Sequence, residues 1–276
     1  MASSTATFMK KTFLDPGKIQ GVVGSGSSSG QQAAALDPLL LPTATANCRL
    51  PLDFYIRTDV VQIARELLGK VLVTEFNGQR TSGRITETEA YRAPDDRACH
   101  AFGNRRTART EIMFQEAGRA YIYLCYGIHH LFNVVTAPAE TAHAVLIRAI
   151  EPIEGIDIMQ QRRAPQPLPN KKKLVHRDLR RGTNHAPLPS GEGLGVGLTT
   201  GPGALAQALG LTTQYTGQSL LVPDSPIWIE DWYEKIMADD IAAGPRIGVG
   251  YAGECAAWHW RFWLKNSPFV KKGAMM

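Results

Sequence analysis

Two β-hairpin signals restrict the possible folds to those that contain an antiparallel sheet. In the first, Asn77 and Gly78 separate residues 70–76 from residues 79–91, two runs that both contain several β-branched side chains. An Asn-Gly pair favours the two-residue turn whose twist matches that of the flanking strands. In the second, Gly127 lies near the tip between residues 119–126 and 129–136. With 276 residues, of which 44% are hydrophobic, the chain can bury a substantial core around such a sheet.

The remaining patterns predict helices around this sheet. Apolar residues recur at helical spacing over residues 60–68, after Thr58 or Asp59, either of which can cap a helix. Pro202 suits the first turn of a helix over residues 201–211. We also expect a short helical turn at 95–102, a helix at 153–162, and strands at 144–150, 219–222, 227–230 and 258–264. The predicted fold class is α+β: a single domain over residues 48–274 with a curved, mainly antiparallel sheet like an open barrel, surrounding helices and a protruding β-hairpin.

Two segments do not fit this domain. Residues 1–47 are rich in Ser, Gly, Ala and Thr and have no core-forming pattern, so we expect a disordered N-terminal arm. The arm is compatible with a transit peptide or with an untargeted tail, but it lacks the apolar run of a secretory signal. Residues 163–199 are rich in Lys, Arg, Gly and Pro, and we expect a flexible basic loop there.

The composition excludes several classes of protein. No run of eighteen apolar residues is present, so no membrane span is expected. The four cysteines stand far apart without a C-x-x-C pair, which argues against a zinc ribbon or a disulfide scaffold. The net charge of +5 permits nucleic acid as a partner without requiring it.

Carboxylates and aromatic rings alternate along the predicted return strand of the first hairpin. Glu87, Glu89 and Tyr91 are two residues apart and therefore point to one face. A carboxylate beside a ring on a buried face can act as a general base, whereas on an exposed face it is an ordinary solvated acid. Strict alternation places Ile85 with the glutamates and Ala90 opposite them, so periodicity does not decide which face is buried.

The second hairpin and the segment before it carry residues suited to DNA. A tyrosine at a tight turn, Tyr126, can insert between stacked bases, although half-buried turn tyrosines are common. Arg105, Arg106 and Arg109, clustered with Thr107, suit phosphate contacts or form a solvated basic loop. The adjacent pair 129–130 places two histidines on opposite faces of a strand, a poor geometry for a metal, and His100 stands alone.

The order of these motifs resembles the alkyladenine (3-methyladenine) DNA glycosylase family over most of residues 50–270. The blocks that carry the resemblance are GRITETEAYRAPDDRACHAFGNRRT, YIYLCYGIHHLFNVV, VLIRAIEPIEG, GPGALAQALGL, RIGVGYAGE and SPFVKK. Three features depart from the family pattern. Ala204 stands where a basic residue is usual, His129 stands where some members have tyrosine, and the loop at 163–199 is long.

The resemblance implies a role for individual residues. Glu89 would activate the attacking water and Arg148 would help to hold it. The base pocket would consist of Tyr91, His100, Tyr123 and Asn133, the last of which would clash with a guanine 2-amino group. Tyr126 would fill the gap left in the duplex. The DNA-backbone contacts would be Thr107, Ile128 through its own backbone, Ile247 and Gly248, and the arginine cluster adds Arg105 to them.

These roles together predict a monofunctional DNA glycosylase of base excision repair. It would flip alkylated or deaminated purines, of the 3-methyladenine, ethenoadenine or hypoxanthine class, out of duplex DNA and hydrolyse the N-glycosidic bond. We expect damaged double-stranded DNA as partner, no metal or cofactor, no membrane, a monomer, and an intracellular location with the DNA, in the nucleus or the bacterial cytoplasm. No lysine stands in the motif to form a Schiff base, so strand cleavage is not expected.

Two alternatives remain from the residues alone. One is a nucleic-acid-binding protein without catalysis, which would gain nothing from an acid at Glu89. The other is a metal-dependent hydrolase that uses Glu87, Glu89 and the histidines.

Overall fold

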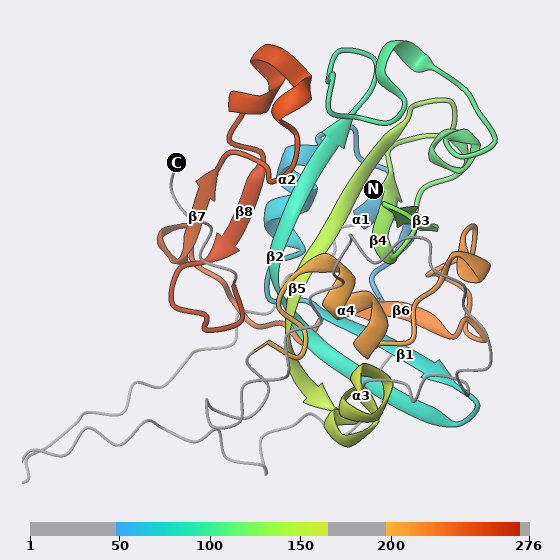
Figure 1. Ribbon diagram of the computed structural model, residues 1–276, viewed down its shortest axis with the longest axis vertical. Helices are drawn as coiled ribbons and strands as arrows, with labels where there is room; N and C mark the ends of the chain where they lie inside the picture. Colours follow the sequence, from blue (N-terminus) through green and yellow to red (C-terminus); the bar gives the residue numbers. More distant parts are fainter. Residues whose placement is uncertain (1–47, 165–196, 271–276) are drawn as a thin grey trace, which may run out of the picture. The chain divides into compact units, whose positions relative to one another are not determined.

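The structure, a computed structural model, describes residues 48–164 and 197–270 (Figure 1). In this part of the chain an eight-stranded antiparallel sheet is flanked by a few short helices and does not close into a barrel. The predicted α+β fold with a curved antiparallel sheet is confirmed. The strands are β1 (Val71–Phe76), β2 (Gln79–Arg92), β3 (Ala120–Cys125), β4 (His129–Thr136), β5 (His143–Glu154), β6 (Ile227–Glu230), β7 (Ile241–Gly244) and β8 (Arg261–Leu264).

The longest strand, β2, connects two arms of the sheet. Its partner along one edge is β5, and the order continues outward through β4 to β3. On the other edge, residues 79–84 pair with β1 and residues 87–89 pair with β8. The sheet therefore forks at β2, with β1 and β6 in one arm and β8 and β7 in the other (Figure 1).

A β-bulge in β2 changes which residues share a face. Ile85 pairs with Ile150 and Glu87 with Ala149, so Thr86 is an extra residue in the ladder. As a result Ile85 and Ala90 both join the main hydrophobic core, although strict alternation would separate them. The placement of Ile85 on the face of the glutamates was therefore wrong, because a bulge shifts the alternation by one residue.

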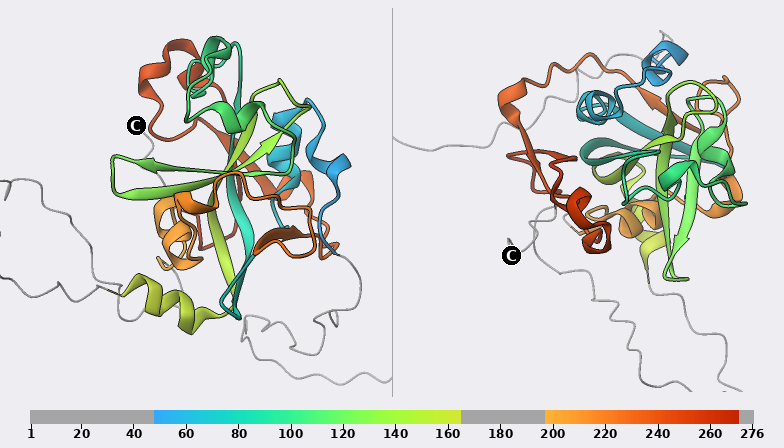
Figure 2. Two further views of the ribbon diagram at one scale, coloured as in Figure 1. Left: turned by 90° about the vertical axis from the view of Figure 1, so that its right-hand side faces the viewer. Right: turned by 90° about the horizontal axis from the view of Figure 1, so that it is seen from above.

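Helices cover both sides of the sheet. The α-helices are α1 (Leu52–Tyr55), α2 (Val60–Glu66), α3 (Ile156–Arg163) and α4 (Pro202–Ala208), and the 3-10 helices are η2 (Phe102–Asn104), η3 (Glu111–Phe114), η4 (Thr213–Tyr215), η5 (Ala238–Asp240) and η6 (Gly250–Ala257). The view in Figure 2 places α2 and α4 on opposite sides of β2 and β5. Asp59 caps α2 by accepting a hydrogen bond from the Gln62 N–H, as expected.

Both predicted hairpins form. Asn77 and Gly78 have φ angles of 54° and 74°, which are the left-handed values that this turn type requires. Tyr126 and Gly127, with φ angles of 51° and 71°, start the connection between β3 and β4, in which Cys125 pairs with His129. The β3–β4 hairpin extends from the body of the sheet (Figure 2).

Some local predictions were wrong. The short helical turn expected at 95–102 is a series of turns that leads into η2 at Phe102. The strand β5 continues to Glu154 because its last residues pair with β2, so α3 begins only at Ile156. Residues 219–222 contain a single bridge from Arg119 to Ser219 instead of a strand, and β8 begins at Arg261 rather than at residue 258.

The predicted N-terminal arm and residues 165–196 of the predicted basic loop lie outside the described residues. The two ends of that loop belong to the fold. Arg163 is the last residue of α3, while Leu198 and Thr199 are buried, and the Thr199 hydroxyl donates to the carbonyl of Ile150 at 2.6 Å. Among the described helices, none has the length and apolar character needed to cross a membrane.

Candidate active site

A cavity of about 480 Å³ lies against one face of the sheet, and much of its lining comes from alternate residues of adjacent strands. Its volume is within the range of small-molecule pockets, about 300–1,000 Å³. The loop after β2 contributes Ala98 and His100, and the segment after β7 contributes residues 247–249. The residues from the strands are Tyr121, Tyr123, Leu124 and Cys125 of β3, Leu131 and Asn133 of β4, Ala144, Leu146 and Arg148 of β5, and Tyr91 of β2.

Glu89 lies directly behind this wall and is fully buried. Its Oε2 accepts a hydrogen bond from the Tyr91 hydroxyl at 2.7 Å, and its Oε1 accepts one from the Ile247 N–H at 2.7 Å. The Arg148 Nη1 lies 3.2 Å from the same Oε1. Three donors therefore surround the carboxylate, and since a carboxylate offers about four lone-pair sites, one on Oε2 remains for a water molecule.

Arg148 is held between two carboxylates. Its Nε donates to the Glu87 Oε1 at 2.9 Å while its Nη1 contacts Glu89. Burial disfavours the charged guanidinium, but the charges of Glu89 and Glu87 outweigh this effect and raise the pKa of Arg148 above its ordinary value. Glu87 also accepts from Arg261 at 3.1 Å, so this carboxylate links β2, β5 and β8. Neither glutamate is on a solvated polar face.

Aromatic side chains line the cavity on several sides. Burial, and next the charge of Glu89, raise the pKa of Tyr91 well above its ordinary value, so its hydroxyl stays protonated and donates to that carboxylate. The His100 Nδ1 lies 2.7 Å from the Tyr121 hydroxyl, and its ring packs edge-on to Tyr123 with centroids 4.6 Å apart. Burial, with the nearby charge of Arg109, lowers the pKa of His100 to about 4. The ring of His100 is therefore neutral near pH 7.

Asn133 is buried in the wall of the cavity beside the tyrosines. Its Nδ2 donates to the carbonyls of Tyr121 at 3.1 Å and Leu131 at 3.4 Å. These two bonds fix the Asn133 amide against the backbone of β3 and β4 at the wall of the cavity.

The rim of the cavity carries exposed apolar residues. Tyr126 is 90% exposed at the tip of the β3–β4 hairpin, and Tyr251 is 71% exposed at the start of η6. Ile247 is also an exposed residue of the lining, and Ile128 is exposed in the turn between β3 and β4. Of the two interpretations of Tyr126, this exposure agrees with a ring that projects from the turn and not with a half-buried tyrosine.

The backbone groups expected to contact DNA are mostly engaged inside the protein. The Ile128 N–H donates to the carbonyl of Cys125 at 3.0 Å, the Thr107 N–H donates to the Thr110 hydroxyl at 2.9 Å, and the Ile247 N–H donates to Glu89. In this conformation these three N–H groups are not free to donate to phosphate. The expectation that Thr107, Ile128 and Ile247 contact the DNA backbone stays a prediction.

The arginine cluster divides into different environments. Arg105 is exposed near η2, as a phosphate contact requires. Arg106 forms ion pairs with Glu111 and Glu140, and it also packs over the Phe114 ring. Arg109 reaches the cavity, with its guanidinium 5.3 Å from the Tyr123 ring centroid.

The histidines do not join the glutamates. His130 accepts a hydrogen bond from the Thr213 N–H, and His129 packs against Gly203 of α4. His100 is hydrogen-bonded to the Tyr121 hydroxyl. Within residues 48–164 and 197–270, no three His, Cys, Asp or Glu side chains form a group that could hold a metal ion. This arrangement does not support the metal-dependent hydrolase.

Comparison with known proteins identifies the family of the chain. The family model for methylpurine-DNA glycosylase matches residues 53–268. Two relatives named as candidate 3-methyladenine DNA glycosylases are similar over most of the chain. The protein from Chlamydia abortus is 46% identical over 215 residues, which cover 78% of this chain and 97% of the relative. The one from Bacillus cereus is 42% identical over 223 residues, which cover 80% of this chain and 98% of the relative. The chain therefore belongs to the methylpurine-DNA glycosylase family, and as a member of it is an N-glycosylase that acts on DNA.

Proposed function

We propose that the protein flips an alkylated or deaminated purine out of duplex DNA into the aromatic cavity and hydrolyses its N-glycosidic bond with a water activated by Glu89. The substrate class is that of 3-methyladenine, ethenoadenine or hypoxanthine. The observation that carries the proposal is the buried Glu89 carboxylate, which is held directly behind the cavity by three residues that line it, Tyr91, Ile247 and Arg148.

The chemistry follows from this placement. As the bond between the purine nitrogen and C1′ of deoxyribose breaks, positive charge develops on the sugar, and the ionised Glu89 stabilises it. The electron pair of this nitrogen–C1′ bond leaves with the purine. The oxygen of a water molecule bonds to C1′, and one proton of that water passes to Glu89. Arg148 positions Glu89 and the water, because its guanidinium is itself fixed by Glu87.

The walls of the cavity suit a purine. The faces of Tyr91 and Tyr123 stack on a flat ring, and their electron density attracts a positively charged alkylated base by about 0.5–2 kcal/mol. The rim supports flipping, since the exposed Tyr126 can occupy the space that the extruded base leaves. Among the described residues that line the cavity, none is a lysine, which supports hydrolysis without strand cleavage.

The partner in this proposal is damaged double-stranded DNA, bound by a monomer wherever the DNA of the cell lies. Membership of a glycosylase family favours an enzyme over a nucleic-acid-binding protein without catalysis. A carboxylate buried behind an aromatic cavity supports the same choice, because a protein that only binds DNA gains nothing from it.

The decisive test is Glu89→Gln, which preserves the shape of the side chain and removes the carboxylate that accepts the proton. We expect this variant to bind duplexes that carry hypoxanthine, ethenoadenine or 3-methyladenine but to release almost no base. The exposed Glu75 on β1 offers a matched control, and Glu75→Gln should release base at the wild-type rate. Near-normal release by Glu89→Gln would remove Glu89 from the catalytic role.

A further inference from the structure

A second buried ion pair lies behind the cavity and takes no part in the chemistry described above. The Arg246 Nη1 lies 2.5 Å from the Asp96 Oδ2 and the Nη2 lies 2.8 Å from the Oδ1, and neither side chain is exposed. Removing two charges from water costs several kcal/mol per ion, so such a pair contributes little to stability as such. Its geometry is more informative than its energy.

The guanidinium of Arg246 connects four segments of the chain. Besides Asp96 in the loop after β2, it donates to the carbonyl of Ala90 in β2 at 2.8 Å and to the carbonyl of Cys255 in η6 at 3.1 Å. Arg246 itself belongs to the segment between β7 and η6. Four of the five N–H donors of the group are therefore used at once, an arrangement that a planar guanidinium allows and an ammonium does not.

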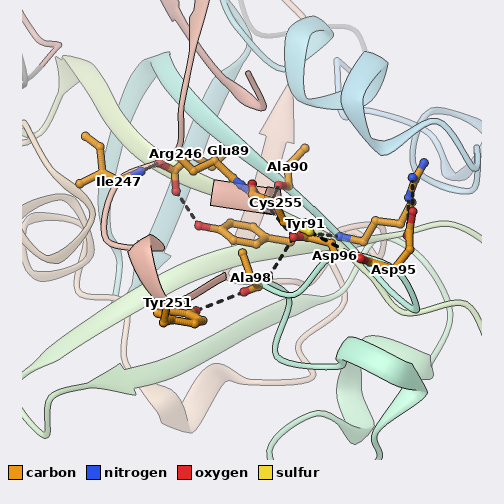
Figure 3. Close-up of polar contacts among 11 residues, drawn as sticks. Glu89, Ala90, Tyr91, Asp95, Asp96, Ala98, Arg246, Ile247, Tyr251 and Cys255 are labelled. Carbon is orange, nitrogen blue, oxygen red and sulfur yellow. Dashed lines mark hydrogen bonds and ion pairs between the residues drawn. The ribbon is translucent and has the colours of Figure 1, made fainter. Parts of the chain in front are cut away.

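Arg246 is connected to both neutral donors to Glu89, to Tyr91 through its guanidinium and to Ile247 through the backbone (Figure 3). Its central carbon lies 4.8 Å from the centroid of the Tyr91 ring, and the Tyr91 hydroxyl donates to the Glu89 Oε2. The residue that follows Arg246 is Ile247, whose N–H donates to the Glu89 Oε1. Ala90, held through its carbonyl, lies between Glu89 and Tyr91 in the strand.

We propose that Arg246 and Asp96 are positioning residues that orient the Glu89 carboxylate, because they hold Tyr91 and the Ile247 N–H at the correct distance from its two oxygens. Neither residue lines the cavity, so both act through Glu89 and its donors. The inference rests on the proposed role of Glu89 as the general base. It assigns a function in the reaction to two charges that neither the substrate nor the water touches.

The test compares Arg246→Lys with the wild type. Lysine keeps the positive charge but cannot hold Asp96 and two carbonyls from one plane or stack on Tyr91. A misplacement of about 1 Å at the reacting groups can cost on the order of 100-fold in rate, so we expect release to fall on the order of 10- to 100-fold. Asp96→Asn, which keeps the shape and loses the charge, should show a similar loss, and it decides the question alone if Arg246→Lys does not fold.

Two measurements separate positioning from a general structural role. The first is the single-turnover rate of hypoxanthine release with excess enzyme, well below the melting temperature of each variant. The second is the affinity for the same duplex, measured with Arg246→Lys or Asp96→Asn combined with Glu89→Gln so that the substrate survives. Arg84→Lys is the matched control, since Arg84 lies on β2, the strand of Glu89, and contacts Glu151 and Glu234 away from the cavity.

The expected result is slow release, unchanged affinity and a normal rate for Arg84→Lys. Wild-type release by folded Arg246→Lys and Asp96→Asn would overturn the proposal, and so would a parallel loss of affinity and rate. If Glu89→Gln is inactive while these two variants release base normally, only the positioning role fails. If Glu89→Gln itself releases base normally, the proposed function fails instead.

Discussion

Replacement of Tyr126 with serine separates base flipping from bond hydrolysis. The side chain is 90% exposed, so its removal deletes almost no intramolecular contact and should change the free energy of unfolding by less than about 0.5 kcal/mol. In the complex with DNA, an aromatic ring stacked on a base contributes about 1–3 kcal/mol. Loss of that stacking disfavours the flipped complex by the same amount, which corresponds to roughly 5- to 150-fold in its equilibrium constant.

The effect should depend on how the target base is paired. In a fully paired duplex the flipped state is costly, so the observed rate of release falls with its population. Where the target is unpaired, extrusion costs less and the flipped state is already well populated, so the rate should change much less. The assay is single-turnover release of hypoxanthine from two duplexes of the same sequence that differ only in the residue opposite the lesion.

A second tyrosine provides the control. Tyr233 is 81% exposed and has a left-handed φ of 57°, close to the 51° of Tyr126, and it does not line the cavity. Tyr233→Ser should therefore release base from both duplexes at the wild-type rate. If Tyr126→Ser slows release from the paired and unpaired targets equally while remaining folded, the ring acts in the chemical step or in the fold, and the stacking role is refuted.

Three further outcomes are expected. Glu87→Gln should lower the free energy of unfolding by up to about 3 kcal/mol in urea titrations, because a buried carboxylate shared by Arg148 and Arg261 loses its charge. It should slow release less than Glu89→Gln does, and an equal loss of rate would contradict the assignment of the catalytic role to Glu89 alone. The pKa of His100 is lowered from 6.5 to about 4, so below pH 6.5 the unfolded chain binds a proton that the folded protein does not. The free energy of unfolding should therefore fall as the pH is lowered from 6.5 to 4. His100→Gln should flatten this pH dependence, and an unchanged slope would show that His100 is not responsible. A chain without residues 1–45 should keep its melting temperature and its rate of release, since the sequence of that segment has no core-forming pattern, and a large drop in melting temperature would move the domain boundary.

Local sequence rules were enough for the hairpins and for the shared face of Glu89 and Tyr91. The Asn77-Gly78 pair specified a turn with two left-handed residues, and the structure has both. The two-residue spacing of Glu87, Glu89 and Tyr91 predicted a shared face, and the hydrogen bond from Tyr91 to Glu89 agrees with it. These features depend on neighbours within a few residues, so the sequence contains all the information that they require.

The same rules failed where the local structure depends on pairing between two segments far apart in the chain. The bulge at Thr86 and the extension of β5 to Glu154 arise from pairing between β2 and β5. The periodicity of neither strand predicts them, because the position of the extra residue depends on how the two strands and the core pack together.

By itself, the sequence determined the antiparallel hairpins, the alternation of carboxylate and tyrosine, and the motif order that identifies a methylpurine-DNA glycosylase. Only the tertiary structure showed that Glu89 and Glu87 are buried, that Arg148 is shared between them, and that the Ile247 N–H, 158 residues further along the chain, donates to Glu89. The Arg246–Asp96 pair could not be predicted from the sequence either, since the two residues are 150 positions apart in segments without regular spacing. A hydrogen bond of this kind depends on where packing brings two loops, and that is a property of the whole core rather than of either local sequence.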